Sequence, residues 1–364
     1  MIGYLESVIS GERRGFMPAI LKCKLALISW IYLGAVKLRR WLYSIGIWRV
    51  RHLPCKVISV GNVVAGGSGK TPAVMAVVRM LSEHTDLNMA VLSRGYRSKI
   101  RGSAVVSDGD SILLTAVEAG DEPHLLGRSL PDVPVLIGKD RFETGLKAIR
   151  EWNCKAIVLD DGFQHLRLAR DIDIITIDAT RPFGFDHLLP RGYLREPLSN
   201  LRYADIILLT RVDQCKNLDM VRGRLAEIAP SVPVFESIYE PRSLRSLDTG
   251  QDMGLDTIRG KNILAVCGIA NPASFADILG SLDTGKVELL SFPDHHKYPP
   301  GSIEKIRLKA AESDAEIIVT TEKDAPKLKS IGNYPVLSLT IELKFLGTEE
   351  KRFVEILSKF ARRS

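Results

Sequence analysis

Short runs of branched aliphatic residues alternate with helical patterns through the first two thirds of the chain. Continuous aliphatic runs bounded by polar or glycine-containing loops are typical of strands that are covered on both faces. Helical stretches such as 71–82 fit between them. The pattern therefore predicts a doubly wound, mostly parallel α/β sheet, with ligands at the carboxyl ends of its strands. The predicted strands are 56–62, 89–96, 134–139, 155–162, 171–178 and 204–211.

The pattern resets near residue 240. The stretch 239–261 is rich in Gly, Asp, Arg and Ser, and new apolar runs follow it at 262–270, 315–324 and 334–343. A loop-like stretch followed by fresh strand signals is typical of a domain boundary. We therefore expect a core domain over 51–245 and a second, smaller α/β domain over 246–364, preceded by a distinct N-terminal segment, 1–50.

The N-terminal segment combines an uncharged run with flanking basic residues. The run 25–36 follows Lys22 and precedes Lys37 and Arg40, and tryptophans lie close by. A membrane span needs roughly 20 apolar residues, so this run by itself is too short to cross a bilayer. On a helix, the three basic residues project from one side. This predicts a helix lying in the membrane interface, and an amphipathic helix packed on the core would give the same pattern.

Composition narrows the possible partners. The chain has 364 residues and a net charge of +7. Its hydrophobic fraction of 45% is typical of a folded globular protein and argues against wholesale disorder. The positive charge favours an anionic partner, for which nucleic acid, a membrane surface and a phosphorylated substrate all qualify. The five cysteines are scattered without a CxxC pair. We therefore expect a reducing compartment, no zinc site, no disulfide framework and no cleaved secretory signal.

The stretch VGNVVAGGSGKTP, residues 60–72, has the order of a phosphate-binding loop: a strand, a loop of small residues and the start of a helix. Glycines in such a loop let backbone N–H groups approach phosphate oxygens. We expect Lys70 at the β and γ phosphates and the hydroxyl of Thr71 at Mg²⁺. Val64 stands where the usual pattern has its first glycine. The residues expected to contact the nucleotide here are Gly66, Gly67, Ser68, Gly69, Lys70 and Thr71.

Two adjacent carboxylates, Asp160 and Asp161, end the predicted strand at 155–162. A nucleotide site of this kind needs an acidic metal ligand at the end of a neighbouring strand. Because adjacent side chains on a strand point to opposite faces, at most one of the two is expected to hold the metal directly, and we favour Asp160. An ordinary strand followed by an Asp-Gly turn is the alternative, and the accompanying phosphate loop weakens it.

Further blocks identify a family. Together with GGSGKTP, they resemble the tetraacyldisaccharide 4'-kinases, the lipid A kinases of Gram-negative bacteria. Each block alone is weak, but their shared order is specific, and the resemblance covers nearly the whole chain. The blocks are SRGYRS (93–98), AGDEPHLL (119–126), LDDGFQHLRLARD (159–171), LLPRGYLREPLSNLRYADIILLTRVD (188–213), FPDHHKY (292–298) and VTTEKDAPK (319–327).

The resemblance implies a P-loop kinase that uses ATP and Mg²⁺ to phosphorylate the 4'-hydroxyl of a tetraacylated disaccharide 1-phosphate, giving lipid IVA. It also implies two α/β units with the active site between them, and peripheral attachment to the cytoplasmic face of the inner membrane through the N-terminal helix. The expected partners are the lipid substrate and an anionic membrane surface, and no nucleic acid is expected. Four acyl chains keep such a substrate in the bilayer, since each buried CH₂ contributes about 0.8 kcal/mol.

The resemblance assigns the chemistry of the acceptor. Asp121 of GDEP matches the family's catalytic aspartate, which acts as the base, and Glu122 beside it helps to hold the site. A histidine of the DHH block orients that aspartate, and we favour His295 over His296. Without the resemblance, two adjacent histidines are more often solvent-facing or structural.

The resemblance also assigns residues around the nucleotide. Arg195 of LREP is expected to neutralise charge on the transferring phosphoryl group, with Glu196 beside it; an ordinary surface ion pair is the alternative. Gln164 and His165 are expected around the metal aspartate. Tyr96 is expected to contact nucleotide or sugar, although it also suits simple packing. The role of Lys323 is open between structure and function.

Two other classes of protein share parts of the pattern. TRVD, residues 210–213, resembles the guanine-reading element of GTP-driven switches and metal-insertion factors, and a comparison of ATP with GTP turnover distinguishes that class. A non-enzymatic ATP-dependent partition or scaffold protein would bind membrane and DNA through its positive charge. It predicts binding that is insensitive to Asp121→Ala, whereas a kinase loses transfer.

Overall fold

The computed structural model describes residues 2–9, 11–96, 98–328 and 331–362. They form two compact units. Unit 1 contains the chain up to residue 94, 138–238 and the chain from 345 onward; unit 2 contains 95–137 and 239–344. This division differs from the expected boundaries at 50 and 245, because an internal segment belongs with the later unit and the last helix belongs with the earlier one. The local sequence does not show which unit either segment belongs to, because that depends on packing between segments that are far apart in the chain.

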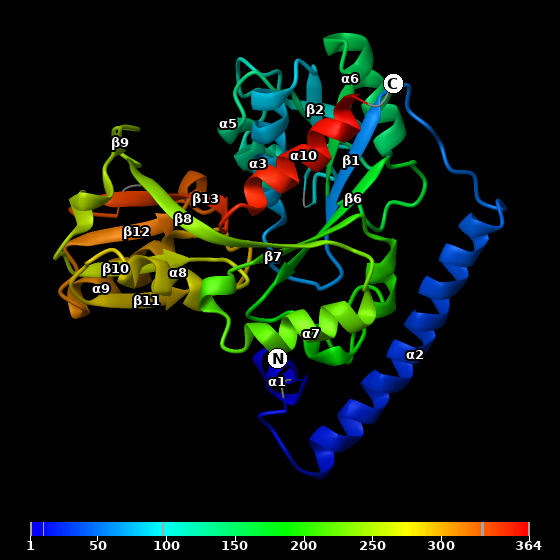
Figure 1. The fold of residues 1–364 in the computed structure, drawn as a ribbon. Coiled ribbons are helices and arrows are strands. Elements are labelled where there is room, and N and C mark those ends of the chain that lie inside the picture. Colours follow the sequence, from blue (N-terminus) through cyan, green and yellow to red (C-terminus); the bar gives the residue numbers. More distant parts are fainter. Residues whose placement is uncertain (1, 10, 97, 329–330, 363–364) are drawn as a thin grey trace. The chain divides into compact units, whose positions relative to one another are not determined.

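Unit 1 is built on a parallel sheet with the strand order β8-β7-β6-β1-β5-β2. The helix α10, near the end of the chain, packs beside α3 (Figure 1). These elements confirm the predicted mostly parallel α/β sheet. Their bounds are β1 Lys56–Gly61, β2 Met89–Ser93, β5 Ala156–Asp160, β6 Ile172–Asp178, β7 Ile206–Thr210, β8 Val234–Ser246, α3 Lys70–His84, α6 Arg141–Trp152, α7 Leu218–Ile228, α10 Glu349–Arg362, and the 3₁₀ helices Gly184–Asp186, Leu198–Tyr203 and Val212–Gln214.

The central position of β1 in the sheet explains why its residues are mostly aliphatic. Ile58 pairs with Val158 of β5 on one side and with Ile172 of β6 on the other, and its side chain is fully buried. A strand that is paired on both sides and covered on both faces favours apolar side chains along most of its length. Because the sheet is parallel, the carboxyl ends of β1, β5, β6 and β7 all meet at one edge, where polar residues begin.

Unit 2 is a smaller α/β unit. Its main sheet has the order β11-β10-β12-β13-β8, in which β10, β11, β12 and β13 are parallel, and β9 pairs antiparallel with β8. The segment 95–137 adds the antiparallel pair β3 and β4 and two helices. The bounds are β3 Ala104–Ser107, α4 Ala116–Ala119, α5 Asp121–Ser129, β4 Val135–Ile137, β9 Asp252–Met253, β10 Ile263–Cys267, α8 Pro272–Gly280, β11 Val287–Ser291, α9 Pro300–Glu312, β12 Ile317–Thr321, β13 Val336–Phe345, and the 3₁₀ helices Leu255–Ile258 and Ala325–Lys327.

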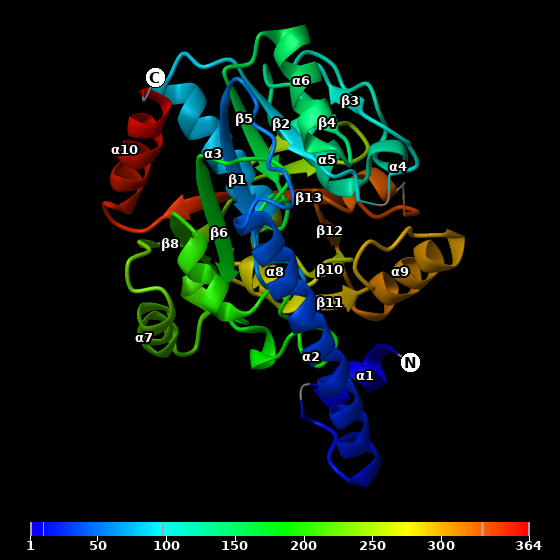
Figure 2. The ribbon, with the colours of Figure 1, turned by 90° about the vertical axis from the view of Figure 1, so that its right-hand side faces the viewer.

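The N-terminal segment forms α1 (Ile2–Ile9) and a long helix, α2 (Phe16–Ser44). The uncharged run 25–36 is too short by itself to cross a bilayer, as expected, but the helix that contains it is much longer than that run. At 29 residues, α2 is long and apolar enough to span a membrane by length and composition, because it continues well beyond the uncharged run on both sides. Within α2 only Leu25 and Ser29 are buried, whereas Trp30 is 72% exposed. Figure 2 shows α2 as the long blue helix.

Candidate functional site

The phosphate loop joins β1 to α3, at the carboxyl edge of the sheet of unit 1, in the predicted order of strand, loop and helix. Helix α3 begins at Lys70, one residue earlier than expected. Gly66 and Gly69 have φ values of +114° and +83°, which residues other than glycine rarely adopt. The path of the backbone therefore requires glycine at these two positions.

Val64 lies in the half of the loop that is extended. It forms an antiparallel bridge with Leu194, and the flanking backbone adds hydrogen bonds from Ala65 to Tyr193 and from Arg195 to Val63, each 2.7 Å long. An extended backbone accepts a β-branched side chain, so the position has no need of glycine. This pairing joins the phosphate loop directly to the LREP block.

Asn62 organises the loop, although the sequence analysis did not identify it. Its side chain is fully buried, its Nδ2 donates to the carbonyl of Val64 (2.6 Å) and to Ser68 Oγ (2.8 Å), and its Oδ1 accepts from Arg195 (2.9 Å). Ser68 Oγ also lies 2.9 Å from Thr176 Oγ1. The only sequence signal for this role is that Asn62 is a polar residue directly after an aliphatic strand. A nucleotide contact by Ser68 remains a prediction, because its hydroxyl is engaged within the protein.

The two carboxylates at the end of β5 have different surroundings. Asp160 is 1% exposed and accepts a hydrogen bond from Ser93 Oγ (2.8 Å). Asp161 has a φ of +56° and accepts two hydrogen bonds from Arg195 (2.7 and 3.1 Å), with Lys70 Nζ at 3.7 Å. Burial acts to raise the pKa of Asp161, but the charges of Lys70 and Arg195 and the hydrogen bonds from Arg195 outweigh it and lower the pKa to about 2.

The oxygens of Thr71, Asp160 and Asp161 are donors that fit Mg²⁺, which prefers oxygen ligands. They lie at the carboxyl ends of the paired strands β1 and β5 and at the start of α3. Within the described residues, no group of three or more His, Cys, Asp or Glu side chains is arranged to hold a metal ion. A small set of protein oxygens is typical of Mg²⁺ that is shared with nucleotide phosphates, so the donor set fits that ion.

Glu196 does not pair with its neighbour Arg195. Its carboxylate is 2% exposed and accepts hydrogen bonds from Arg40 on α2 (2.6 and 2.9 Å) and from Asn200 Nδ2 (2.7 Å). Tyr32, also on α2, donates its hydroxyl proton to the carbonyl of Arg195 (2.8 Å). The LREP block is therefore held by α2, and a surface ion pair between Arg195 and Glu196 is excluded.

The GFQH block is held in a similar way. Gln164 Nε2 donates to the carbonyl of Asn62 (2.8 Å), and the carbonyl of Gln164 accepts from Arg39 of α2. Burial, and secondarily the charge of Arg141, lowers the pKa of His165 to about 4, so His165 is neutral at pH 7. Arg141 is itself 2% exposed and donates to the carbonyls of Gly138 (2.6 Å) and Asp160 (3.3 Å). A fully buried arginine has no signal in the local sequence.

In TRVD, Arg211 supports the phosphate loop. Its NH1 contacts Asp178 Oδ2 at 2.6 Å and the carbonyl of Gly67 at 3.2 Å. Thr210 Oγ1 donates to the carbonyl of Ser68 at 3.3 Å. These contacts make Thr210 and Arg211 part of the scaffold of the phosphate loop.

Unit 2 contains the residues that are predicted to act on the acceptor hydroxyl. Asp121 is the first residue of α5 and follows Gly120, whose φ is +97° and where a Cβ would lie 2.7 Å from the carbonyl oxygen of Tyr96. Asp121 Oδ2 lies 2.9 Å from His295 Nδ1 and 2.8 Å from Lys327 Nζ. Burial acts to raise the pKa of Asp121, and the hydrogen bonds from His295 and Lys327 outweigh it, so the net shift is downward.

The two histidines of the DHH block face different partners. His295, at a φ of +61°, directs its ring toward Asp121. His296 Nε2 lies 2.7 Å from Ser302 Oγ, and its ring stacks on Phe292 with centroids 4.6 Å apart. The structure therefore brings His295 to Asp121 and holds His296 elsewhere, while the catalytic role of either residue stays a prediction.

The remaining predicted residues of unit 2 surround this pair. Lys323 Nζ lies 3.0 Å from Asp294 Oδ1 and 3.8 Å from Glu122 Oε1. The ring of Tyr96 is 59% exposed and its centroid lies 5.9 Å from that of His295. Lys323 and Glu122 thus belong to the charged surroundings of Asp121. Lys327 was not identified from the sequence, and its only signal was its place in the VTTEKDAPK block.

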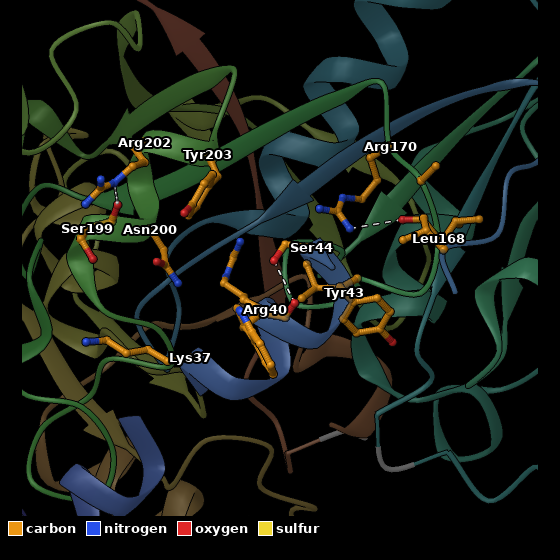
Figure 3. A pocket seen from close by; sticks show the side chains of 14 residues that line it. Lys37, Arg40, Tyr43, Ser44, Leu168, Arg170, Ser199, Asn200, Arg202 and Tyr203 are labelled. Atoms are coloured by element: carbon orange, nitrogen blue, oxygen red, sulfur yellow. Dashed lines mark hydrogen bonds between the residues drawn. The ribbon is translucent and has the colours of Figure 1, made fainter. Parts of the chain in front are cut away.

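Unit 1 also has a basic pocket of about 680 Å³ between the end of α2, the loop at 166–170 and the 3₁₀ helix Leu198–Tyr203 (Figure 3). Among its cations, Arg40 is paired with Glu196 and Arg170 with Asp173, at 2.6 and 2.9 Å. Tyr203 lies against Arg40, with the guanidinium 4.9 Å from the ring centroid. The lining residues are Lys37, Arg40, Trp41, Tyr43, Ser44, Val50, Leu166, Leu168, Ala169, Arg170, Ser199, Asn200, Arg202 and Tyr203.

Comparisons with known proteins match nearly the whole chain to one enzyme family. The family model described as tetraacyldisaccharide-1-P 4'-kinase matches residues 21–362. A tetraacyldisaccharide 4'-kinase of Syntrophus aciditrophicus is 44% identical over 92% of this chain and 91% of its own, and one of Halothermothrix orenii is 36% identical over 95% and 93%. The crystal structure of LpxK from Aquifex aeolicus in complex with ATP matches with a TM-score of 0.72 and 32% identity, over 93% of this chain and 99% of that one.

Proposed function

This chain belongs to the tetraacyldisaccharide 4'-kinase family, and we propose that it transfers the γ-phosphoryl group of ATP to the 4'-hydroxyl of a tetraacylated disaccharide 1-phosphate, giving lipid IVA in lipid A biosynthesis. The observation that carries the proposal is the carboxylate of Asp121, held by His295 in a chain that also has a phosphate loop ending in Lys70. A GTP-driven switch is not favoured, because the family model and the curated relatives that match this chain are tetraacyldisaccharide 4'-kinases.

Lys70 and Arg195 are the cations that act on the phosphates. Both contact Asp161 through charge, and Arg195 does so with two hydrogen bonds. When the phosphates of ATP occupy the loop, these cations neutralise the charge that develops as the γ-phosphoryl group leaves the β–γ bridging oxygen. Mg²⁺ held by Thr71 and by Asp160 or Asp161 supplies further neutralisation of the β and γ phosphates when it is bound.

Asp121 acts as the base. As the oxygen of the 4'-hydroxyl forms its bond to the γ phosphorus, the hydroxyl proton passes to the Asp121 carboxylate, and ADP leaves with the bridging oxygen. His295 orients the carboxylate through its Nδ1, 2.9 Å away. Because its pKa is lowered, Asp121 is ionised at neutral pH and is able to accept the proton.

We further propose peripheral attachment to the cytoplasmic face of the bacterial inner membrane. From Ser29 to Arg40, α2 makes hydrogen bonds to unit 1, so this part stays at the protein surface. The preceding part, residues 16–28, is about 20 Å long at 1.5 Å per residue, which is shorter than a bilayer core of about 30 Å. Exposed apolar side chains on α2, together with Lys37 and Arg202 at the basic pocket, suit an anionic interface.

The test is incubation of the full chain with labelled ATP and tetraacyldisaccharide 1-phosphate in mixed micelles, followed by location of the new phosphate. We expect label at the 4' position, with ATP preferred over GTP. Asp121→Asn should reduce turnover at least about a hundredfold while ATP still binds, since a general base contributes 10²–10⁴. Label at another position, or an equally active Asp121→Asn variant, would refute the proposal.

A further inference from the structure

Lys327 contacts the same oxygen of Asp121 as His295 does. Its Nζ lies 2.8 Å from Asp121 Oδ2, and His295 Nδ1 lies 2.9 Å from that atom. Asp121 Oδ1 accepts neither of these hydrogen bonds. The two donors come from segments of unit 2 that lie well apart in the sequence. Together they define the orientation of the carboxylate group.

Lys327 is itself held in place. Its ammonium group also donates to Asp324 Oδ1 and to the carbonyl of His296, both at 3.3 Å, so its three N–H bonds have three acceptors. Asp324 is fully buried, and its Oδ2 accepts from the backbone N–H of Gly268 (2.8 Å) and from Thr321 Oγ1 (2.9 Å). A lysine with all of its donors engaged has lost the rotational freedom that usually makes lysine a poor positioning group.

We propose that Lys327 is a positioning residue for Asp121: together with His295 it occupies Oδ2, so that Oδ1 faces the acceptor hydroxyl and receives its proton. In the transfer step, the O–H bond of the acceptor breaks, its proton bonds to Oδ1, and its oxygen bonds to the γ phosphorus as ADP leaves. This inference rests on the proposed function, since it assumes that Asp121 is the base.

Charges around Asp121 give the inference a measurable consequence. The groups that act on the carboxylate are His295, Lys327, Lys323, His124 and Tyr298, while Asp294 and Glu122 face Lys323. Burial acts to raise the pKa of Asp121, and hydrogen bonds from His295 and Lys327 hold it below its usual value. Removing Lys327 removes one of those bonds and a positive charge, so the pKa of Asp121 must rise.

A higher pKa of Asp121 lowers the rate at acidic pH. Asp121 accepts a proton only when it is ionised, so turnover falls as pH drops through its pKa. In Lys327→Met we expect the acid limb of the kcat profile to move up by about one pH unit or more, because an opposite charge at this distance shifts a carboxyl pKa by roughly 1–3 units. We expect kcat at neutral pH to fall about tenfold or more, since the carboxylate loses its orientation, and KM for ATP to stay within about twofold.

Three further variants make the test specific. Lys327→Arg keeps the charge and should return the acid limb most of the way to the position in the parent protein. Lys309→Met removes a half-buried lysine of unit 2 that pairs with Glu288, and should leave the profile unchanged. Because Lys327→Met leaves Asp324 without its cation, thermal unfolding is measured first; if that variant does not fold, Lys327→Met with Asp324→Asn removes both charges and carries the same test.

A folded variant without Lys327 that keeps the parental acid limb and kcat overturns the inference, as does a Lys327→Arg variant whose limb stays displaced. Failure of the proposed function has a different signature. If Asp121→Asn keeps full turnover, Asp121 is not the base, whatever Lys327 does. If Asp121→Asn is inactive while Lys327→Met behaves as the parent, the base assignment stands and only the role of Lys327 is refuted.

Discussion

Arg40 of the N-terminal helix α2 donates two hydrogen bonds to the buried carboxylate of Glu196, 156 positions later in the chain. Glu196 directly follows Arg195, whose guanidinium holds Asp161 beside the phosphate loop. The helix expected to contact a membrane is thus part of the framework of the nucleotide residues in unit 1. Deletion of the N-terminal segment would disturb both properties together, so each needs its own test.

The first prediction concerns membrane binding. Leu27→Asn, Trp30→Gln and Ile31→Asn together replace exposed apolar side chains of α2 and leave Tyr32 and Arg40 in place. We expect binding to vesicles that contain anionic phospholipid to weaken by at least about tenfold, because the apolar area that would enter the interface is lost. Cosedimentation measures this, with equilibrium ATP binding expected to stay unchanged.

The matched control is Met220→Asn, which replaces an exposed apolar residue of α7. It should sediment with vesicles like the parent. Equal sedimentation of the α2 triple variant and the parent would show that this face of α2 does not bind the membrane.

The second prediction concerns the link between α2 and LREP. Arg40→Met leaves the carboxylate of Glu196 buried with Asn200 as its remaining partner. Removing one partner of a buried ion pair typically costs about 3 kcal/mol, so we expect a clear fall in the free energy of unfolding and a higher KM for ATP. Urea unfolding and initial-rate kinetics are the measurements. Adding Glu196→Gln should recover part of the lost stability, and a fully additive double variant would argue against the coupling.

The third prediction explains the missing glycine of the phosphate loop. Because Val64 is extended and bridged to Leu194, Val64→Ala should change KM for ATP by less than about threefold. Gly66→Ala forces a side chain onto a φ of +114°, a strain of roughly 1–3 kcal/mol, and should raise KM for ATP by about tenfold. A larger effect at Val64 than at Gly66 would contradict this account of the loop.

The fourth prediction concerns pH and stability. Burial and the charge of Arg141 lower the pKa of His165 from 6.5 to about 4. Protonation therefore favours the unfolded chain, and the contribution of neutral His165 is fully present above pH 6.5 and is lost as pH falls toward 4. After allowance for its partial exposure, we expect His165→Asn to remove roughly 1–2 kcal/mol of pH dependence in that window. Urea unfolding of the parent and the variant at pH 7 and pH 5 measures this change. An equal loss of unfolding free energy in both proteins between pH 7 and pH 5 would be inconsistent with a lowered pKa of His165.

Expectations that rested on local pattern agree with the structure. The aliphatic runs 56–62, 89–96, 155–162, 171–178 and 204–211 form parallel strands, whereas 134–139 forms β4, which pairs antiparallel with β3. GGSGKT forms a loop with Gly66 and Gly69 at positive φ. Expectations that needed distant partners did not follow from pattern. Glu196 turned out to pair with α2, and the chain from 95 to 137 joined the later unit, because side-chain pairing and domain membership depend on contacts between segments far apart in sequence.

The sequence by itself determined the strands, the phosphate loop and the adjacent aspartates, since burial on both faces and the steric needs of a tight loop restrict residue types at neighbouring positions. Only the tertiary structure decided which histidine meets Asp121 and that Lys327, 206 positions away, meets it as well. It also decided that α2 holds the loop containing Arg195. These contacts are formed by side chains whose positions depend on the packing of whole elements, and their hydrogen bonds have no counterpart in the local sequence.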